Sequence, residues 1–297
     1  MRRHLRIPLL SLAAAVAAAP ARAQDRPPSA AEIRALIERA IANQHNNDAA
    51  LWLYERIERR QIRKNPADAT PAEDKTFRVV PAGTGNARAL VEENGKPVDA
   101  ALYRKQLADV QQGLTSAADP EKPGRKQELE KFAKKMRERA ELVDAIRDAF
   151  RFSWADRETH QGRALAKLNF EPNPEFRAAS RSTSFFLHVR GALWIDESAA
   201  QVVRIEAEVF SDISFVGGIA GKVYRGSRFT MEQAEIAPGV WLPTLYDYNL
   251  GGRKFLFGFE IHERTEVSQY RRIGPPSEAA ALIRKEIENS QPNRASP

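Results

Sequence analysis

Residues 190–210, RGALWIDESAAQVVRIEAEVF, alternate between apolar and polar side chains in two runs separated by turn-forming residues. Leu193 and Ile195 share one face of the first run, and Val203 and Ile205 share one face of the second. Alternation with a period of two is typical of strands that cover a core with one face and meet water with the other. The segment therefore predicts a β-hairpin of an antiparallel sheet, whose apolar side has to be buried.

The same pattern recurs along most of the chain. Strands are expected at 50–64, 75–82, 87–98, 150–155, 163–170, 183–196, 201–210, 222–232, 240–249 and 254–268. A capping box from Ser29 to Glu32 predicts a helix near the start, and a short helix is expected at 277–289. Consecutive antiparallel strands with helices segregated from them predict an α+β fold on one strongly curved sheet.

The first 23 residues have the pattern of a secretory signal peptide. A basic start, MRRHLR, precedes a short apolar run and an A-x-A cleavage site that ends at Ala23. Cleavage there leaves an exported form that begins at Gln24, most simply a soluble periplasmic protein. No later segment is long and apolar enough to predict a transmembrane helix. The chain has no cysteine, which excludes both an acylated thiol and a disulfide.

Removal of the signal peptide also changes the charge. The full chain has 46 Lys and Arg against 39 Asp and Glu, a net charge of +7. Four of these basic residues and none of the acidic ones lie in residues 1–23, which leaves about +3. The remaining basic residues are interleaved with acidic ones, so the sequence does not predict binding to nucleic acid.

Residues 99–150 differ from the rest of the chain because they predict helices. A helix at 99–114 and a long amphipathic helix at 125–150 flank the breaker-rich segment TSAADPEKPG. The expected organisation is one domain at 24–274 with a helical insert at 99–150, followed by a short helix and a disordered tail in 275–297.

The long helix has an apolar stripe at helical spacing, formed by Leu129, Phe132, Met136, Val143 and Ile146. Such a stripe has to be covered on a soluble protein, because exposed apolar patches promote association. We therefore expect residues 125–150 to dock as a lid over the open side of the sheet.

Motifs for catalysis are missing from the sequence. The segment FVGGIAGKVYRGS resembles a phosphate-binding loop, but Val216 replaces the first glycine of that motif and Val223 replaces the required Ser or Thr. There is no G-x-S-x-G elbow, no thiol nucleophile and no metal-binding spacing of histidines. The sequence thus predicts no catalytic residue, no cofactor and no metal.

Large apolar side chains are instead concentrated on a few strands. The candidate residues for contact with a lipid are Phe185, Leu187, Leu193, Ile195, Val203, Ile205, Phe255, Phe257, Phe259 and Ile261. One interpretation is an ordinary filled sheet core, which is what most such stripes form. The other is a face that its helices fill only in part, so that it accepts a hydrophobic ligand. Both interpretations are compatible with the sequence.

Several segments resemble outer-membrane lipoprotein-sorting proteins, the LolA/LolB-like superfamily. They are the signal peptide, the short helix after it, LWLYERIERRQ, RGALWIDESAAQVVRIEAEV and GSRFTMEQAEIAPGVWLPTLYDYNLGGR. The resemblance covers roughly residues 29–98 and 150–270. It implies an unclosed antiparallel β-barrel with helices across its mouth and an apolar cavity that holds the acyl chains of lipoproteins. The helical insert departs from the compact pattern of the family.

These observations lead to one function hypothesis and two alternatives. We expect a soluble periplasmic carrier or binder of lipid acyl chains or lipoproteins, which works without covalent chemistry. The first alternative is an envelope protein-interaction or sensing module that uses the same fold to hold a protein partner. The second alternative, ranked below the first, is an enzyme.

Overall fold

The computed structural model describes residues 26–215, 221–254 and 257–290. Its α-helices are α1 (Ala30–Ala50), α2 (Ala100–Ala118), α3 (Arg125–Ala149), α4 (Arg181–Ser184) and α5 (Pro276–Asn289), and short 3₁₀ helices span Leu51–Leu53 and Phe185–His188. The expected signal peptide with its cleavage site at Ala23, the expected cavity residue Phe255 and the tail from residue 291 lie outside the described residues.

The strands alternate with short turns over most of the chain. They are β1 (Tyr54–Arg63), β2 (Glu73–Pro81), β3 (Asn86–Glu93), β4 (Lys96–Pro97), β5 (Phe150–His160), β6 (Arg163–Pro172), β7 (Val189–Asp196), β8 (Gln201–Val209), β9 (Ile213–Phe215), β10 (Gly221–Val223), β11 (Arg228–Ala237), β12 (Val240–Lys254) and β13 (Phe257–Arg272).

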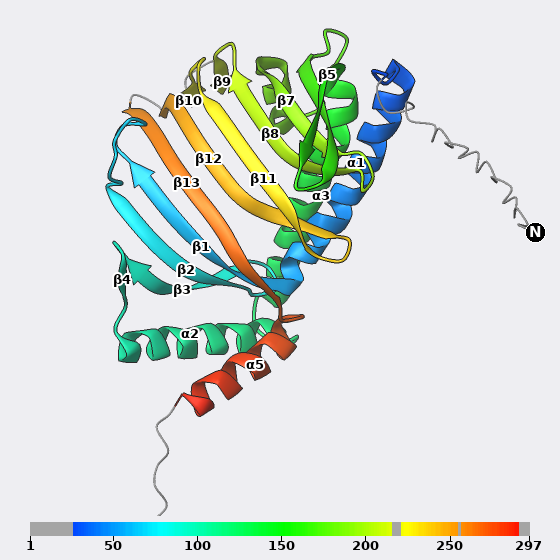
Figure 1. Ribbon diagram of the computed structural model, residues 1–297. Helices are drawn as coiled ribbons and strands as arrows, with labels where there is room; N and C mark the ends of the chain where they lie inside the picture. Colours follow the sequence, from blue (N-terminus) through cyan, green and yellow to red (C-terminus); the bar gives the residue numbers. More distant parts are fainter. Residues whose placement is uncertain (1–25, 216–220, 255–256, 291–297) are drawn as a thin grey trace, which may run out of the picture.

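All thirteen strands found in the described residues belong to one antiparallel sheet. Its order is β4-β3-β2-β1-β13-β12-β11-β8-β7-β6-β5, and the short β9 and β10 extend it beside β12. The edge strands β4 and β5 do not pair with each other, so the sheet curves without closing (Figure 1). The predicted α+β fold on one curved antiparallel sheet is confirmed.

Helices α1 and α3 lie together across one face of this sheet, which we call the inner face (Figure 1). Helix α1 begins with the predicted capping box, in which the Ser29 amide donates to the Glu32 carboxylate at 2.6 Å. Its apolar side, with Ile33, Leu36 and Ile37, is buried in a core shared with strands β5 to β8. Burial of the apolar side of α1 therefore holds this helix against strands β5 to β8.

Helices α2 and α5 pack on the opposite face, which we call the outer face, beside strands β1 to β3 (Figure 1). Val80 of β2, Leu114 of α2 and Ile283 of α5 belong to this second core and are almost completely buried. The side chain of Arg78 joins sheet and helix, because it donates to Glu286 of α5 at 2.6 Å. The two long helices of the 99–150 segment thus cover different faces, and only α3 reaches the inner face.

Residues 183–188 are helical, so the prediction of a strand from residue 183 is wrong. The Thr183 amide donates to the Ser180 hydroxyl at 3.2 Å in a second capping box, and this local bond starts α4. The predicted strand at 222–232 is likewise divided, since β10 ends at Val223 and β11 begins at Arg228. Residues 50–53 continue the helical conformation of α1, and β1 starts only at Tyr54.

A β-bulge changes which residues of β8 face the core. Leu193 pairs with Ile205, but Ile195 pairs with Val202, so the strand contains one extra residue between them. Val202 therefore joins Ile205 in packing against the core. The prediction that Val203 shares the face of Ile205 is wrong, because a bulge reverses the alternation.

The sheet depends on a close approach at Gly191 of β7. A Cβ atom at this position would overlap the Glu206 carbonyl oxygen and lie 2.9 Å from the Phe170 ring. Gly191→Ala should therefore lower the free energy of unfolding by about 2–3 kcal/mol, because neither neighbour is a flexible chain end. Urea unfolding followed by tryptophan fluorescence measures this change.

Gly113→Ala in helix α2 is the matched control. No atom lies within 4 Å of the added Cβ, so the change should raise the free energy of unfolding by about 0.5–1 kcal/mol. An unchanged unfolding midpoint for Gly191→Ala would contradict the close approach of these strands.

Candidate functional site

A cavity of about 490 Å³ lies between the inner face of the sheet and helices α1 and α3. Its aliphatic and small lining residues come from both helices, from the 3₁₀ helix after α1 and from four strands: Ile37, Ala40, Ile41, Leu51, Leu142, Val143, Ile146, Val189, Leu193, Val202, Ile205, Ala207, Met231, Leu242 and Pro243. This size and composition are typical of pockets that bind small apolar ligands.

Aromatic rings form one wall of the cavity. Phe150 packs edge-on against Phe170 and Phe186, with ring centroids 4.9 Å and 5.1 Å apart. Phe152 and Phe185 extend this cluster. Edge-to-face packing holds the rings in defined positions, so the wall is apolar and well ordered.

Polar side chains line another part of the cavity: Gln44, Asn47, Asp48, Arg139, Tyr246 and Tyr248. Arg139 of α3 and Asp48 of α1 form an ion pair at 2.7 Å, and Gln44 donates to the same carboxylate at 2.7 Å. Burial raises the pKa of the Tyr246 hydroxyl to about 12, so this group is neutral at physiological pH. The cavity therefore combines an apolar body with a polar part that contains one ion pair.

Buried amide hydrogen bonds fasten α1 to the sheet. Asn47, 2% exposed, donates to the Gln201 side chain of β8 at 2.8 Å and accepts from the Trp241 amide of β12 at 3.1 Å. Asn43, one turn earlier, donates to the Ala199 and Ala200 carbonyl oxygens at 2.9 Å. Because buried polar groups are costly to leave unpaired, these bonds fix the position of α1.

Helix α3 makes its polar contacts with α1 and packs against the 3₁₀ helix that follows α1. His45 and Asp144 meet at 2.8 Å with side chains that are 35% and 60% exposed, and the Arg139 side chain is half exposed. The Phe132 ring packs edge-on against Trp52, with centroids 4.8 Å apart. Polar contacts between such partly exposed side chains contribute little to stability, so they hold α3 less firmly than the buried hydrogen bonds hold α1.

The structure brings together three of the residues that the sequence singled out for lipid contact. Phe185, Leu193 and Ile205 line the cavity. Ile195 is fully buried in the adjoining core and lies outside the lining. Leu187 is exposed at the end of the short helical segment before β7, and Val203 lies at the bulge in β8, so neither lines the cavity.

The aromatic residues of β13 also lie away from the cavity. The register pairs Ile261 with Leu250 and Phe259 with Gly252, which places them on the inner face but at the end of the sheet that α1 and α3 do not cover (Figure 1). Phe257 is 79% exposed. The expectation that these side chains line the same cavity as Leu193 is therefore wrong.

Only some residues of the predicted apolar stripe of α3 line the cavity. Val143 and Ile146 line the cavity, as expected for a helix that covers the open side of the sheet. Phe132 and Met136 are half-buried outside the lining, and Leu129 is exposed. Only the second half of α3 roofs the cavity.

Apart from Phe185, sequence reasoning missed the aromatic wall, and it missed the polar part of the lining. Phe150 and Phe152 alternate as in a strand, and the spacing of Ile37 and Ile41 predicted the buried side of α1, so both signals were present in the sequence. Nothing in the local pattern distinguishes Tyr246 from other residues of a half-buried strand.

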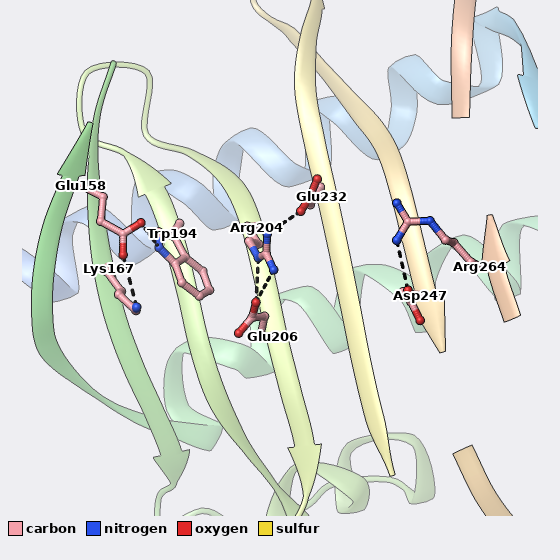
Figure 2. A network of polar contacts seen from close by, with 8 residues as sticks. All are labelled: Glu158, Lys167, Trp194, Arg204, Glu206, Glu232, Asp247 and Arg264. Carbon is pink, nitrogen blue, oxygen red and sulfur yellow. Dashed lines mark hydrogen bonds and ion pairs between the residues drawn. The ribbon is translucent and has the colours of Figure 1, made fainter. Parts of the chain in front are cut away.

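The outer face beside α2 and α5 has a different character. Charged side chains and one tryptophan form a row across strands β5 to β13, as Figure 2 shows: Glu158, Lys167, Trp194, Arg204, Glu206, Glu232, Asp247 and Arg264. Arg204, for example, donates to Glu232 on the neighbouring strand at 2.7 Å. Such cross-strand pairs suit a face in contact with water. These strands are therefore polar on their outer face and apolar where they line the cavity on the inner face.

The chemistry that the cavity offers is burial of apolar groups. Over the described residues its lining contains neither serine nor histidine, and its carboxylate and guanidinium are paired with each other. The part of the chain that the structure describes has no group of three side chains placed to hold a metal ion. No helix within these same ranges is long and apolar enough to cross a bilayer.

No protein-family model matches this sequence, and no curated protein is found to be similar to it. The chain is similar in structure to a domain from Vibrio parahaemolyticus named for outer membrane lipoprotein sorting (TM-score 0.32, 10% identity, 83% of this chain and 99% of that chain). It is also similar to a LolA superfamily protein from Nitrosomonas europaea (TM-score 0.29, 10% identity, 80% of this chain and 92% of that chain). A DUF1329 family protein from Desulfovibrio piger gives a TM-score of 0.28 at 9% identity, over 81% of this chain and 93% of that one. At TM-scores and identities this low the three structures do not assign a role, and the cavity has to be interpreted from its own residues.

The role of Asn47 can be measured directly. Asn47→Ala should lower the free energy of unfolding by about 2–3 kcal/mol, because it leaves the Trp241 amide and the Gln201 side chain buried without their partner. Asn46→Ala changes the preceding, exposed residue of the same helix and should stay within about 0.5 kcal/mol of the wild type. Equal effects of the two changes in urea unfolding would contradict the anchoring role of Asn47.

Proposed function

We propose that this protein binds an acyl chain of a lipid or lipoprotein without covalent chemistry, in the cavity beneath α1 and α3. The observation that carries the proposal is the lining itself, in which aliphatic and aromatic side chains surround about 490 Å³ of space. Each methylene moved from water into such a space contributes about 0.8 kcal/mol. A chain of moderate length therefore gains enough free energy to offset the cost of association.

The export signal expected in residues 1–23 suits this function. An acyl chain in an aqueous compartment has to be shielded from water, and a carrier in the periplasm supplies such shielding between the two membranes. The polar outer face is compatible with a protein that stays in solution while it holds an apolar ligand.

Helix α3 is the proposed moving cover of the cavity. Its residues Val143 and Ile146 roof the apolar body, while contacts between partly exposed polar side chains join it to α1. Helix α1 stays in place because Asn43 and Asn47 fasten it to the sheet. Loading and release of a chain then require α3 to move away from α1.

Filling the cavity tests the proposal. Ala207 lies in the lining on β8, opposite Gly191, so Ala207→Phe places a ring in the space without burying a charge. The affinity for a neutral lipophilic dye, N-phenylnaphthylamine, should fall at least about tenfold, because the ring and the dye compete for one volume. Dye fluorescence measures the affinity, and circular dichroism verifies the fold.

Phe257→Asp is the control, because this side chain is exposed at the end of β13. It should leave both the fold and dye binding unchanged. Loss of binding in Phe257→Asp but not in Ala207→Phe would move the site to the end of the sheet. A wild-type protein that binds no lipophile would favour the alternative of a protein-interaction module.

The movement of α3 can be blocked by a covalent link to α1. The chain has no native cysteine, so His45→Cys with Asp144→Cys provides a single pair for a short bis-maleimide across the two helices. Cross-linking should slow dye exchange at least about tenfold relative to the same variant before cross-linking, because the cover can no longer open.

A pair within α3, Lys134→Cys with Glu138→Cys, controls for the reagent, since these side chains meet on one helix. It should leave the exchange rate unchanged. If stopped-flow measurements give the same rate for the α1–α3 link and this control, α3 is a static part of the fold.

A further inference from the structure

Exposed apolar side chains are concentrated at one end of the sheet, where β7 and β13 begin (Figure 1). The register aligns the strands there, since Arg228 pairs with both Glu208 of β8 and Asn249 of β12. We call this end the rim and define it by residues 187–190, 208–212, 222–228, 252–254 and 257–261. Of the eight large apolar side chains that are exposed among the described residues, five lie at the rim: Leu187, Phe210, Tyr224, Phe257 and Ile261. Such a concentration indicates an interaction surface.

The apolar side chains of the rim protrude from the protein. Phe257 is 79% exposed, and none of the five belongs to the lining of the cavity beneath α1 and α3. A rigid protein partner has to provide a matching depression for each protruding side chain. The fluid interface of a bilayer adapts to them, and it is the environment in which aromatic and aliphatic side chains flanked by basic ones are favoured.

The rim also contains the excess positive charge of the protein. Its basic residues are Arg190, Lys222, Arg225, Arg228, Arg253 and Lys254, and its acidic residues are Glu208, Asp212 and Glu260. The difference is about +3, which equals the net charge expected for the exported form that begins at Gln24. The remainder of that form is therefore close to neutral, and the charge is gathered beside the exposed apolar side chains.

Some of the basic side chains at the rim have no acidic partner. Lys222 pairs with Asp212 at 2.7 Å. Arg225, Arg228 and Lys254 are exposed and form no ion pair within the described part of the chain. Their charges are thus available to an anionic surface, which attracts Lys and Arg residues that lie close to it.

The inner side of the rim is continuous with the cavity. Tyr248 of β12 lines the cavity, and alternation places Leu250 next on the same face. Leu250 pairs with Ile261 of the rim. Farther out, the Phe259 ring packs against Gly252, where an added Cβ would lie 2.5 Å from it. A row of apolar side chains therefore leads from the lining to the rim.

We propose that the rim docks on the surface of an anionic phospholipid bilayer, with Phe257 in the interface and the unpaired basic side chains beside the lipid phosphates. Docking places the outer end of the apolar row at the membrane, where an acyl chain can pass between the bilayer and the cavity. This transfer rests on the proposed function, whereas docking itself does not require an occupied cavity. A second copy of the chain is a poorer occupant of the rim, because two surfaces of like charge repel each other.

Vesicle sedimentation tests the docking. The full exported protein is mixed with vesicles of phosphatidylglycerol and phosphatidylcholine in equal parts, or with vesicles of phosphatidylcholine alone. Partitioning should be at least about tenfold stronger into the anionic vesicles, because the basic side chains are attracted to their surface potential. It should weaken as salt is added, since salt screens this attraction.

Variants of the rim locate the surface. Phe257→Asp should reduce partitioning into the anionic vesicles at least about tenfold, because an apolar ring that enters the interface is replaced by a charge. Arg225→Gln with Lys254→Gln should reduce it by a similar factor at low salt and by less at high salt. Circular dichroism verifies the fold, and the affinity for N-phenylnaphthylamine should stay at the wild-type value in both variants.

Matched changes on α3 control for the loss of an apolar group or of positive charge elsewhere on the surface. Leu129, Lys131 and Lys135 are exposed on the first half of α3, and that helix begins at Arg125 beside the turn at Gly83, opposite the rim. Leu129→Asp should keep the wild-type partitioning, and so should Lys131→Gln with Lys135→Gln.

Three results would overturn the inference. Equal partitioning into both kinds of vesicle would contradict recognition of an anionic surface, and equal losses in the rim variants and the α3 controls would contradict the location. Dimers that Phe257→Asp dissociates, in a protein that binds no vesicles, would assign the rim to a second copy.

Dye binding separates this inference from the proposed function. If the protein binds N-phenylnaphthylamine but no vesicles, docking fails and the proposed function stands. If it binds anionic vesicles through the rim but no dye, docking stands and the proposed function fails.

Discussion

The arrangement of the inner face depends on the hydrogen bonds of one buried amide, Asn47. It joins α1 to a side chain of β8 and to the backbone of β12, two strands that are separated in the sheet by β11. With its position fixed in this way, α1 can bury Ile33 and Leu36 at its beginning and still leave space beneath Ile37 and Ile41. Helix α3 in turn contacts α1, so the roof of the cavity is built on a helix that polar bonds hold in place.

Different helices bury the apolar side chains on the two faces of the sheet. Helices α1 and α3 cover the inner face of one half, while α2 and α5 cover the outer face of the other half (Figure 1). Where helices do not cover the outer face, ion pairs cross from strand to strand (Figure 2). The space beneath α1 and α3 is apolar and lies between packed elements, whereas the apolar side chain of Phe257 at the end of β13 is exposed. A ligand that enters this space is therefore shielded from water on several sides. The two helices between β4 and β5 belong to different cores, so α2 lies on the outer face and α3 on the inner face.

Much of the fold could be predicted from the sequence, because period-two alternation and capping residues act locally. The hairpin of β7 and β8, the capping box of α1 and the long helix α3 are all found where the pattern placed them. The errors arose where local hydrogen bonds or register intervened. The Ser180 cap replaced the start of a strand by a helical turn, and the bulge near Val203 reversed the faces of β8.

The candidate site was harder to predict, for a different physical reason. Alternation indicates which residues share a face but not whether a helix covers that face. Phe257 and Leu193 have equally strong patterns, yet only Leu193 lies beneath the helices. The hydrogen bond from the Trp241 amide to Asn47 joins two lining residues that are far apart in the sequence, and it has no local signature. Distant contacts of this kind become visible only in the assembled sheet.

The claim that an acyl chain lies beneath α1 and α3 is tested most directly by photo-crosslinking. A fatty acid with a diazirine near the end of its chain is bound to the exported protein, activated by light and mapped by peptide mass spectrometry. The modified residues should fall within the apolar lining, on α1, β7 and β8 around Ile37, Leu193 and Ile205. An excess of unlabelled fatty acid should abolish the modification. Labelling confined to the exposed end of β13 around Phe257, or labelling that competitor does not reduce, would contradict binding in this cavity.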